Sequence, residues 1–562
     1  MLLFNGRIHT LDAASSVVDA LVVRDGRVVF AGRRGDVNPA AGEATLDLGG
    51  RTVLPGLVDG HGHLMLLARA RLELDLAAAR SEGEVAAMVG QAARGLREGE
   101  WISGRGWDQT RWPGGRFPTR ASLDRAAPGH PVALVRVDGH ATWASGAALG
   151  RADITRRTTD PPGGRIERDE RGEPTGLLID LAQDLIRGLV PPPSEERFDT
   201  AVRAVIAECL AKGLTGAHEP GLDLAGIASY TRLIGRGHFP FRVFAALSGK
   251  KAWAQYRERG APESIGDGQL TVGAVKLWLD GALGSRGAAL HAPYCDDPAN
   301  TGLVLVPPEE VERLTREATA HGFHVWVHAI GDRANTLVLD VFENVRADGG
   351  PHHRLIGGTV RGQGGPGPRL RVEHAQILAP ADIPRFARLG VVPSMQPTHC
   401  TSDMRWAGER LGPERLVGAY AWRSVLDSGA YVAGGSDFPV EDANPFHGIH
   451  AAVTRRPREG DDPGWQPEQR MTRDEAVRAF TIWNARSIGR ESEQGSLEPG
   501  RRADLIALPD DVFACDAARI ASLSPVLTML GGEVVYAAGQ DAGASFAARP
   551  LRSAGSTSDT SA

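Results

Sequence analysis

Two histidines separated by one residue, His61 and His63, follow the apolar run 53–58. Residues two positions apart in an extended strand point to the same side, so both imidazoles leave the backbone together. Neutral imidazoles suit zinc and related metals, whereas two of them make a poor hydrophobic core. Core histidines satisfied by hydrogen bonds are the alternative for an isolated pair. The pair predicts a metal site if other ligand types converge on it.

Other residues that can bind a metal lie in or just after later apolar runs. They are Lys276, His328, His374 and Asp437, and His218-Glu219 ends a further run with either a direct or a supporting role. Glu373 precedes His374, so strand alternation places it on the opposite face, and we leave it outside the ligand set. Only four of the 63 basic residues are lysines. A retained Lys276 therefore calls for a chemical reason, since only lysine offers a primary amine.

Eight apolar runs alternate with helical patterns through the middle of the chain. The runs are 53–58, 214–217, 241–247, 271–277, 324–327, 370–372, 391–395 and 431–433. This alternation predicts an α/β fold, a (β/α)8 TIM barrel, in which the C-terminal ends of the strands meet at one mouth. The candidate ligands would then meet at that mouth.

The two ends of the chain have a different pattern, in which short segments alternate apolar and polar residues as β-strands do. Asp25-Gly26 between apolar runs is a strong hairpin signal. We expect residues 1–52 and 491–540 to form one small β-sandwich, and residues 53–490 to form the barrel with a large insertion at 78–200 after its first strand. Residues 541–562 are rich in Ala, Ser, Thr and Gly, which predicts a disordered tail.

The composition is that of a globular protein, with 42% hydrophobic and 23% charged residues in 562. A net charge of −6 is mild and argues against a nucleic-acid or anionic-membrane surface. No apolar run is long enough to span a bilayer, and no signal peptide opens the chain, so we expect a cytoplasmic protein. The four cysteines form no C-x-x-C pair, which argues against a cysteine zinc site.

The predicted constellation suits hydrolysis at one or two divalent ions, with zinc favoured. Two ions about 3.5–4 Å apart lower the pKa of a water that they share. Asp437 could take a proton from that water and pass it to a leaving nitrogen. We hypothesise that Lys276, deprotonated by burial and nearby positive charge, captures carbon dioxide and becomes N6-carboxylysine, an anionic bridge between metals. A buried ion pair is the alternative for Lys276.

The motifs resemble the amidohydrolase superfamily, and in particular amidohydrolase family 3, which includes N-substituted formamide deformylases. The resemblance rests on 55–63 (PGLVDGHGH), 106–109 (GWDQ), 138–140 (DGH), 276–281 (KLWLDG), 328–334 (HAIGDRA), 396–397 (QP), 435–439 (GSDFP) and 495–505 (GSLEPGRRADL). It covers nearly the whole chain. It implies metal ligation by His61, His63, Lys276, His328, His374 and Asp437. Gly60 stands where such proteins often have Ser or Thr.

We therefore expect a hydrolase that cleaves a non-peptide C–N bond, an amide or an N-acyl or N-formyl group of a small molecule. Lactone hydrolysis, phosphoester hydrolysis and deamination on the same site are alternatives, because they share the water-activating machinery. A non-catalytic scaffold or regulatory relative is another. The sequence leaves open whether the protein forms a homodimer.

Weaker candidates for substrate contact lie in loops and in the insertion. They are Trp107, His140, Trp143, Asp280, Arg286 and His399. The tryptophans of the insertion suggest a lid with aromatic walls, which would suit a hydrophobic substituent on the substrate.

Overall fold

The computed structural model describes residues 1–38, 42–136, 141–162, 164–347, 367–459 and 463–539. Two compact units are present, Met1–Leu64 with Arg203–Ala562 and Met65–Val202. In this described part of the chain, no helix combines the length and apolarity needed to cross a bilayer. The predicted tail at 541–562 lies outside the described residues.

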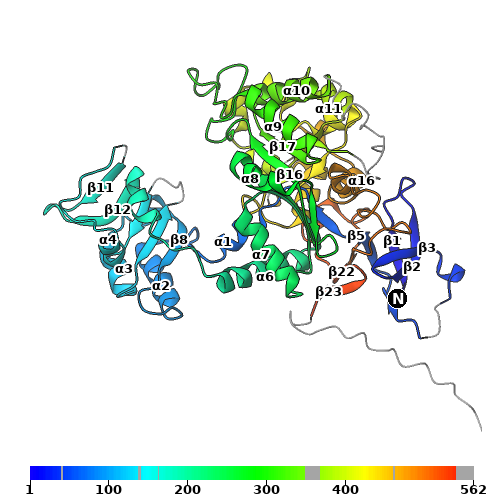
Figure 1. Cartoon of the computed structure of the whole chain (residues 1–562), viewed down its shortest axis with the longest axis horizontal. Helices are drawn as coiled ribbons and strands as arrows, with labels where there is room; N and C mark the ends of the chain where they lie inside the picture. The colour runs from blue at the N-terminus through cyan, green and yellow to red at the C-terminus, as the bar shows by residue number, and fades with distance from the viewer. Residues whose placement is uncertain (39–41, 137–140, 163, 348–366, 460–462, 540–562) are drawn as a thin grey trace, which may run out of the picture. The chain divides into compact units, whose positions relative to one another are not determined.

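Eight parallel strands form the centre of the larger unit, as the alternation predicted (Figure 1). In sheet order they are β20 (Ala433–Gly434), β19 (Val392–Met395), β18 (Leu370–His374), β17 (His324–Ala329), β16 (Leu270–Trp278), β14 (Arg242–Ser248), β13 (Leu214–Leu222) and β6 (Leu57–Asp59). The helices that follow them in turn include α7 (Leu224–Gly235), α8 (Gly249–Tyr256), α9 (Pro308–Ala320), α10 (Asp332–Ala347), α11 (Ile383–Leu389), α14 (Trp422–Asp427) and α15 (Pro445–Thr454). The fold is a nearly closed (β/α)8 barrel.

Polar contacts close the barrel between its first and last strands. The Gly60 N–H donates to the Gly434 carbonyl (2.8 Å). The Asn484 side-chain amide donates to the carbonyls of Val58 (2.7 Å) and Gly434 (2.9 Å). Buried Asp59 accepts from the Ser436 hydroxyl (2.6 Å). Residues at the two ends of the sheet are thereby held side by side, although most of the chain separates them.

The predicted first run, 53–58, divides at Gly56, which corrects the strand assignment. Thr52–Pro55 (β5) pairs with β21 (Leu505–Leu508) in a second sheet, and only β6 enters the barrel. Gly56 lies against β13, where a Cβ would stand 2.3 Å from the Thr215 hydroxyl. The second sheet joins both ends of the chain through β1 (Leu2–His9), β2 (Val17–Arg24), β3 (Arg27–Gly32), β4 (Thr45–Asp47), β5, β21, β22 (Leu527–Leu530) and β23 (Glu533–Ala537). The predicted hairpin forms at Asp25 (φ 49°) and Gly26 (φ 71°).

The smaller unit has its own sheet and core. Its strands, in sheet order, are β11 (Gly164–Arg168), β12 (Pro174–Asp180), β10 (Ala141–Ala144), β9 (Val132–Arg136), β8 (Ile102–Trp107) and β7 (Leu74–Asp75). The helices α2 (Glu82–Ala93) and α3 (Arg120–Ala126) pack on one another in this unit. The insertion is thus a folded unit rather than a long loop.

Candidate metal centre

His61 and His63 stand just past the C-terminal end of β6. Their ring centroids lie 5.4 Å apart, edge to face. The His61 main-chain N–H donates to Asp59 (2.9 Å), which fixes the turn after the strand. Gly62 has no room for a side chain, because a Cβ there would lie 2.2 Å from the Phe438 ring. The tight turn presents both imidazoles at the mouth of the barrel.

Asp437 reaches the same point from the loop after β20. Its backbone has φ 60°, and its N–H donates to the His61 carbonyl (2.7 Å). Its Oδ1 lies 3.5 Å from His61 Nε2 and 3.2 Å from His63 Nε2. Burial alone would raise the pKa of Asp437, but the neighbouring imidazoles outweigh burial and lower it well below its usual range. The carboxylate is therefore ionised and adjoins both histidines.

His374 reaches the mouth through an unusual backbone conformation. It ends β18 with φ 75°, which turns the side chain away from the alternation of the strand. Its ring centroid lies 4.8 Å from that of His61 and 4.5 Å from that of His328. Its Nδ1 lies 2.8 Å from Gln396 Oε1, so Nδ1–H is the donor and Nε2 is left for another partner.

Glu373 contacts the site, which corrects our expectation from strand alternation. The carboxylate is fully buried, and its Oε2 lies 2.5 Å from His61 Nδ1. Strand alternation holds for the regular part of β18 and places the Glu373 side chain inside the barrel. From there the carboxylate reaches His61. A polar residue at an inward position of a barrel strand was the available signal.

Lys276 and His328 come from neighbouring strands, β16 and β17. Lys276 is 1% exposed, and its Nζ lies 5.6 Å from the Trp278 ring. Burial lowers the pKa of Lys276 to about 8, against the opposing effect of Glu373 and Asp437. Burial and then the Lys276 charge lower the pKa of His328 to about 3, so this imidazole is neutral. Its Nε2 is buried and has no hydrogen-bond partner in the described part of the chain.

Two trios of ligand-type atoms share Asp437. His61, His63 and Asp437 form one, and His374, His399 and Asp437 form the other, with the atoms of each trio within 4.8 Å of one another. His399, a weak substrate candidate in the sequence, thus lies beside the carboxylate, 3.8 Å from its Oδ2. Imidazole nitrogens around a carboxylate are a donor set suited to zinc. These residues could hold a divalent ion.

Two predicted substrate contacts are core residues. Trp107 and Trp143 are both 0% exposed in the cluster that fills the smaller unit. Their indole N–H groups donate to the carbonyls of Leu134 (2.8 Å) and Thr119 (3.0 Å). With no exposed surface and no free N–H, they stabilise the insertion and present no wall to a substrate. This corrects the expectation that Trp107 and Trp143 contact the substrate.

Asp280 and Arg286 both make contacts that brace loops. Buried Asp280 accepts from the main-chain N–H groups of Ala289, Ile330 and Gly331 at 2.8–3.0 Å. Arg286 pairs on the surface with Asp296 (2.9 Å). These contacts favour the bracing alternative, and Asp280 Oδ1 also lies 3.6 Å from His328 Nε2. His140 lies outside the described residues.

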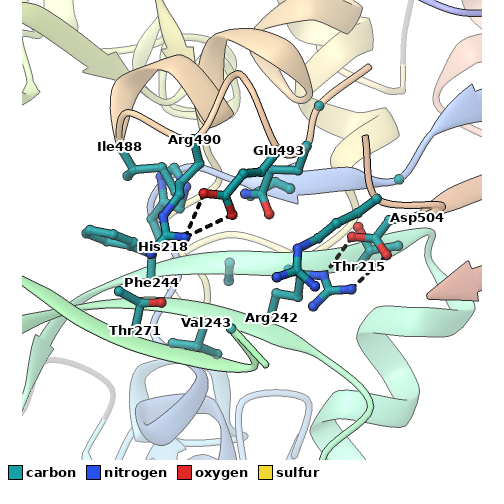
Figure 2. Close-up of a pocket in the computed structure, with 18 residues that line it drawn as sticks. Thr215, His218, Arg242, Val243, Phe244, Thr271, Ile488, Arg490, Glu493 and Asp504 are labelled. Atoms are coloured by element: carbon teal, nitrogen blue, oxygen red, sulfur yellow. Dashed lines mark hydrogen bonds and ion pairs between the residues drawn. The ribbon is translucent and has the colours of Figure 1, made fainter. Parts of the chain in front are cut away.

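A small cavity lies at the other end of the barrel strands (Figure 2). Thr215, Val243 and Thr271, which line it, stand near the starts of β13, β14 and β16. Its charged residues are already paired, Arg242 with Asp504 and Arg490 with Glu493. The cavity measures about 40 Å³, room for little more than a water molecule. It is not a substrate site.

Known proteins are similar to this chain over nearly its whole length. The model of the amidohydrolase family matches residues 44–536. The chain belongs to the amidohydrolase family. "Putative amidohydrolase YtcJ" of Bacillus subtilis is 35% identical over 94% of this chain and 98% of its own length. N-substituted formamide deformylase of Arthrobacter pascens is 30% identical over 95% and 98%.

A solved structure agrees in fold. The crystal structure of an uncharacterized metal-dependent hydrolase from Pyrococcus furiosus matches with a TM-score of 0.76 and 28% identity, over 91% of this chain and 99% of that one. The family resemblance and the barrel predicted from the sequence are confirmed. This amidohydrolase is a hydrolase acting on C–N or related bonds.

His61→Ala should weaken zinc binding by more than about 100-fold. Loss of a ligand should cost more than loss of its hydrogen-bonding partner, which costs about 10–100-fold. Chelator competition on the folded protein measures the affinity. His321→Ala is the matched control, since His321 is exposed and, among the described residues, its ring hydrogen-bonds only the Glu317 carbonyl (2.8 Å) and packs edge-on against Trp253. Unchanged affinity in His61→Ala would contradict the assignment.

Proposed function

We propose that this amidohydrolase hydrolyses an amide C–N bond, N-acyl or N-formyl, in a small molecule at a zinc centre. The observation that carries the proposal is the convergence of His61, His63, His374 and His399 on the single carboxylate of Asp437. A bound divalent ion supplies Lewis acidity and lowers the pKa of its water. The two trios that share Asp437 favour two adjacent positions for ions.

Asp437 moves the proton in the proposed reaction. It is held as a carboxylate by the imidazoles and by its main-chain bond to His61. It accepts a proton from the attacking water as the C–O bond forms, and it donates that proton to the departing nitrogen as the C–N bond breaks. The amide and one water molecule thus yield one carboxylic acid and one amine. His63, 3.2 Å from the carboxylate, orients it.

We propose that Lys276 carries a carbamate. Its Nζ donates to no carboxylate oxygen in the described part of the chain, although Glu373 and Asp437 are close enough to affect it electrostatically. An ammonium at a cation-binding centre is repelled by the ions. The neutral amine attacks carbon dioxide, a C–N bond forms, and one proton is released. The resulting anion joins the ligands His328 and His374.

The substrate we favour has an apolar N-substituent. The tryptophans do not supply this argument, but other residues do. Four exposed large apolar side chains of the larger unit, Leu303 (63%), Leu305 (54%), Val417 (59%) and Val440 (69%), stand in segments that follow the C-terminal ends of β16, β19 and β20, with Val417 in the short helix η5 (Arg415–Gly418). Exposed apolar surface at a mouth favours an apolar ligand. The similarity to a formamide deformylase also favours an N-formyl amine.

Zinc-loaded protein should release amine from N-formyl and N-acetyl amines. We expect faster turnover of N-benzyl than of N-methyl compounds, by several-fold in kcat/KM, because only the former covers the apolar loops. Asp437→Asn should lower kcat by about 10²–10⁴-fold, because the variant has no carboxylate to move the proton. Asp427→Asn, whose carboxylate is 64% exposed on α14, is the control.

The same assay separates the alternatives. Faster hydrolysis of lactones or phosphoesters, or deamination, would replace the amide proposal with that reaction. A folded, zinc-loaded protein that is inert toward all of these compounds would favour the scaffold alternative.

Carbon-13 bicarbonate tests Lys276 directly. Wild-type protein loaded with zinc should show one carbamate carbon signal by NMR, and Lys276→Arg should lack it, because a guanidinium does not capture carbon dioxide. Lys250→Arg, at a surface pair with Glu310 (2.9 Å), should keep the signal. A wild-type spectrum without a carbamate carbon would refute the modification.

A further inference from the structure

Arg371 is a fully buried charge inside the barrel. It is 0% exposed on β18, and its guanidinium carbon lies 4.1 Å from the centre of the Trp326 ring. Its polar partners are Glu373 Oε1 (2.8 Å) and Oε2 (3.0 Å), the Gly60 carbonyl (2.8 Å), Ser394 Oγ (2.8 Å), Ser487 Oγ (3.2 Å) and His218 Nδ1 (3.0 Å). These partners come from several strands and from the helix α17 (Ile482–Ser487).

Stability alone does not account for a fully buried arginine, because its burial has an unfavourable desolvation free energy. Removing a guanidinium and a carboxylate from water carries a penalty of several kcal/mol for each ion, and a well-packed apolar pair often does as well. Of the described residues, Glu373 is the only carboxylate that Arg371 hydrogen-bonds. The buried pair therefore calls for a role beyond packing.

Glu373 connects this pair to the candidate metal centre. Its Oε2 accepts from Arg371 and also lies 2.5 Å from His61 Nδ1. A carboxylate accepts only, so Nδ1 carries the hydrogen and the Nε2 lone pair is free. That Nε2 faces Asp437 Oδ1 at 3.5 Å. The contact fixes both the tautomer and the ring orientation of His61.

Arg371 also acts on the backbone before His61. Its Nη2 donates to the Gly60 carbonyl and to Glu373 Oε2, so one nitrogen holds both the backbone and the ring support of the histidine. His218 accepts from Nη1 through Nδ1 and is a neutral partner. Burial and then the Arg371 charge lower the pKa of His218 well below its usual value.

We propose that Glu373 and Arg371 are positioning residues of the metal centre: Glu373 fixes the His61 tautomer that offers Nε2 to the ion, and Arg371 holds Glu373 and the Gly60 carbonyl in place. This inference rests on the metal centre proposed above. Residues that hydrogen-bond a ligand histidine without binding the metal themselves orient that histidine and raise its basicity. The expected cost of losing the carboxylate is 10–100-fold in metal affinity.

Two variants of Glu373 test the proposal through metal affinity. Glu373→Gln keeps the size but removes the charge, and its amide group has donors that face a guanidinium. Glu373→Asp keeps the charge for Arg371 but is one methylene too short to reach His61 as well. Both should bind zinc about 10–100-fold more weakly by chelator competition. The Co²⁺ absorption spectrum of each should differ from that of wild type, since the orientation of one ligand changes.

Asp504→Asn is the matched control. It likewise replaces a carboxylate with an amide against an arginine, the partly buried Arg242 at 2.6 and 3.0 Å, and in the described part of the chain it hydrogen-bonds no histidine. It should lower stability but leave zinc affinity and the Co²⁺ spectrum unchanged. Circular dichroism checks the folding of every variant.

The outcomes separate this inference from the proposed function. Wild-type zinc affinity and spectrum in either folded Glu373 variant would overturn the positioning role, and the pair would then be purely structural. A wild-type protein that binds no zinc would instead refute the metal centre itself. If Glu373→Gln does not fold, Glu373→Asp decides.

Discussion

The main-chain hydrogen bond from Asp437 to the His61 carbonyl is the contact on which the candidate centre depends. It joins the first and last strands of the barrel at the mouth, and it sets the carboxylate within 3.5 Å of both His61 and His63. The bond exists because the sheet closes below it, through Asn484 and the Asp59–Ser436 contact. The barrel must close before the most distant ligands can meet.

Burial gives the centre its chemistry. Desolvation lowers the pKa of His61 to about 4, against the raising effect of Asp437 and Glu373, and desolvation with the Lys276 charge lowers the pKa of His328 to about 3. A carboxylate surrounded by imidazoles stays ionised. Neutral nitrogen donors and anionic oxygen are what a borderline cation such as zinc prefers. The amine of Lys276 is the one cationic group of the set, and carboxylation would convert it to an anion.

Much of this arrangement could be predicted from the sequence. Apolar runs and their terminal polar residues gave eight strands and the ligand types, because parallel strands present their C-terminal ends together. The division of 53–58 at Gly56 could not be predicted, since one apolar run serves two sheets. Strand alternation failed at His374, where positive φ redirects the side chain, and it hid the contact of Glu373 with His61. The tryptophans of the insertion gave no signal that separates a core from a lid.

Anomalous diffraction from zinc-loaded crystals tests the central claim most directly. We predict zinc peaks at about 2.0–2.2 Å from Nε2 of His61 and from Asp437. We expect the other ligands of the bound zinc to come from His63, Lys276, His328, His374 and His399. Zinc bound only elsewhere, with the His61–Asp437 cluster free of anomalous density at saturating metal, would contradict the account.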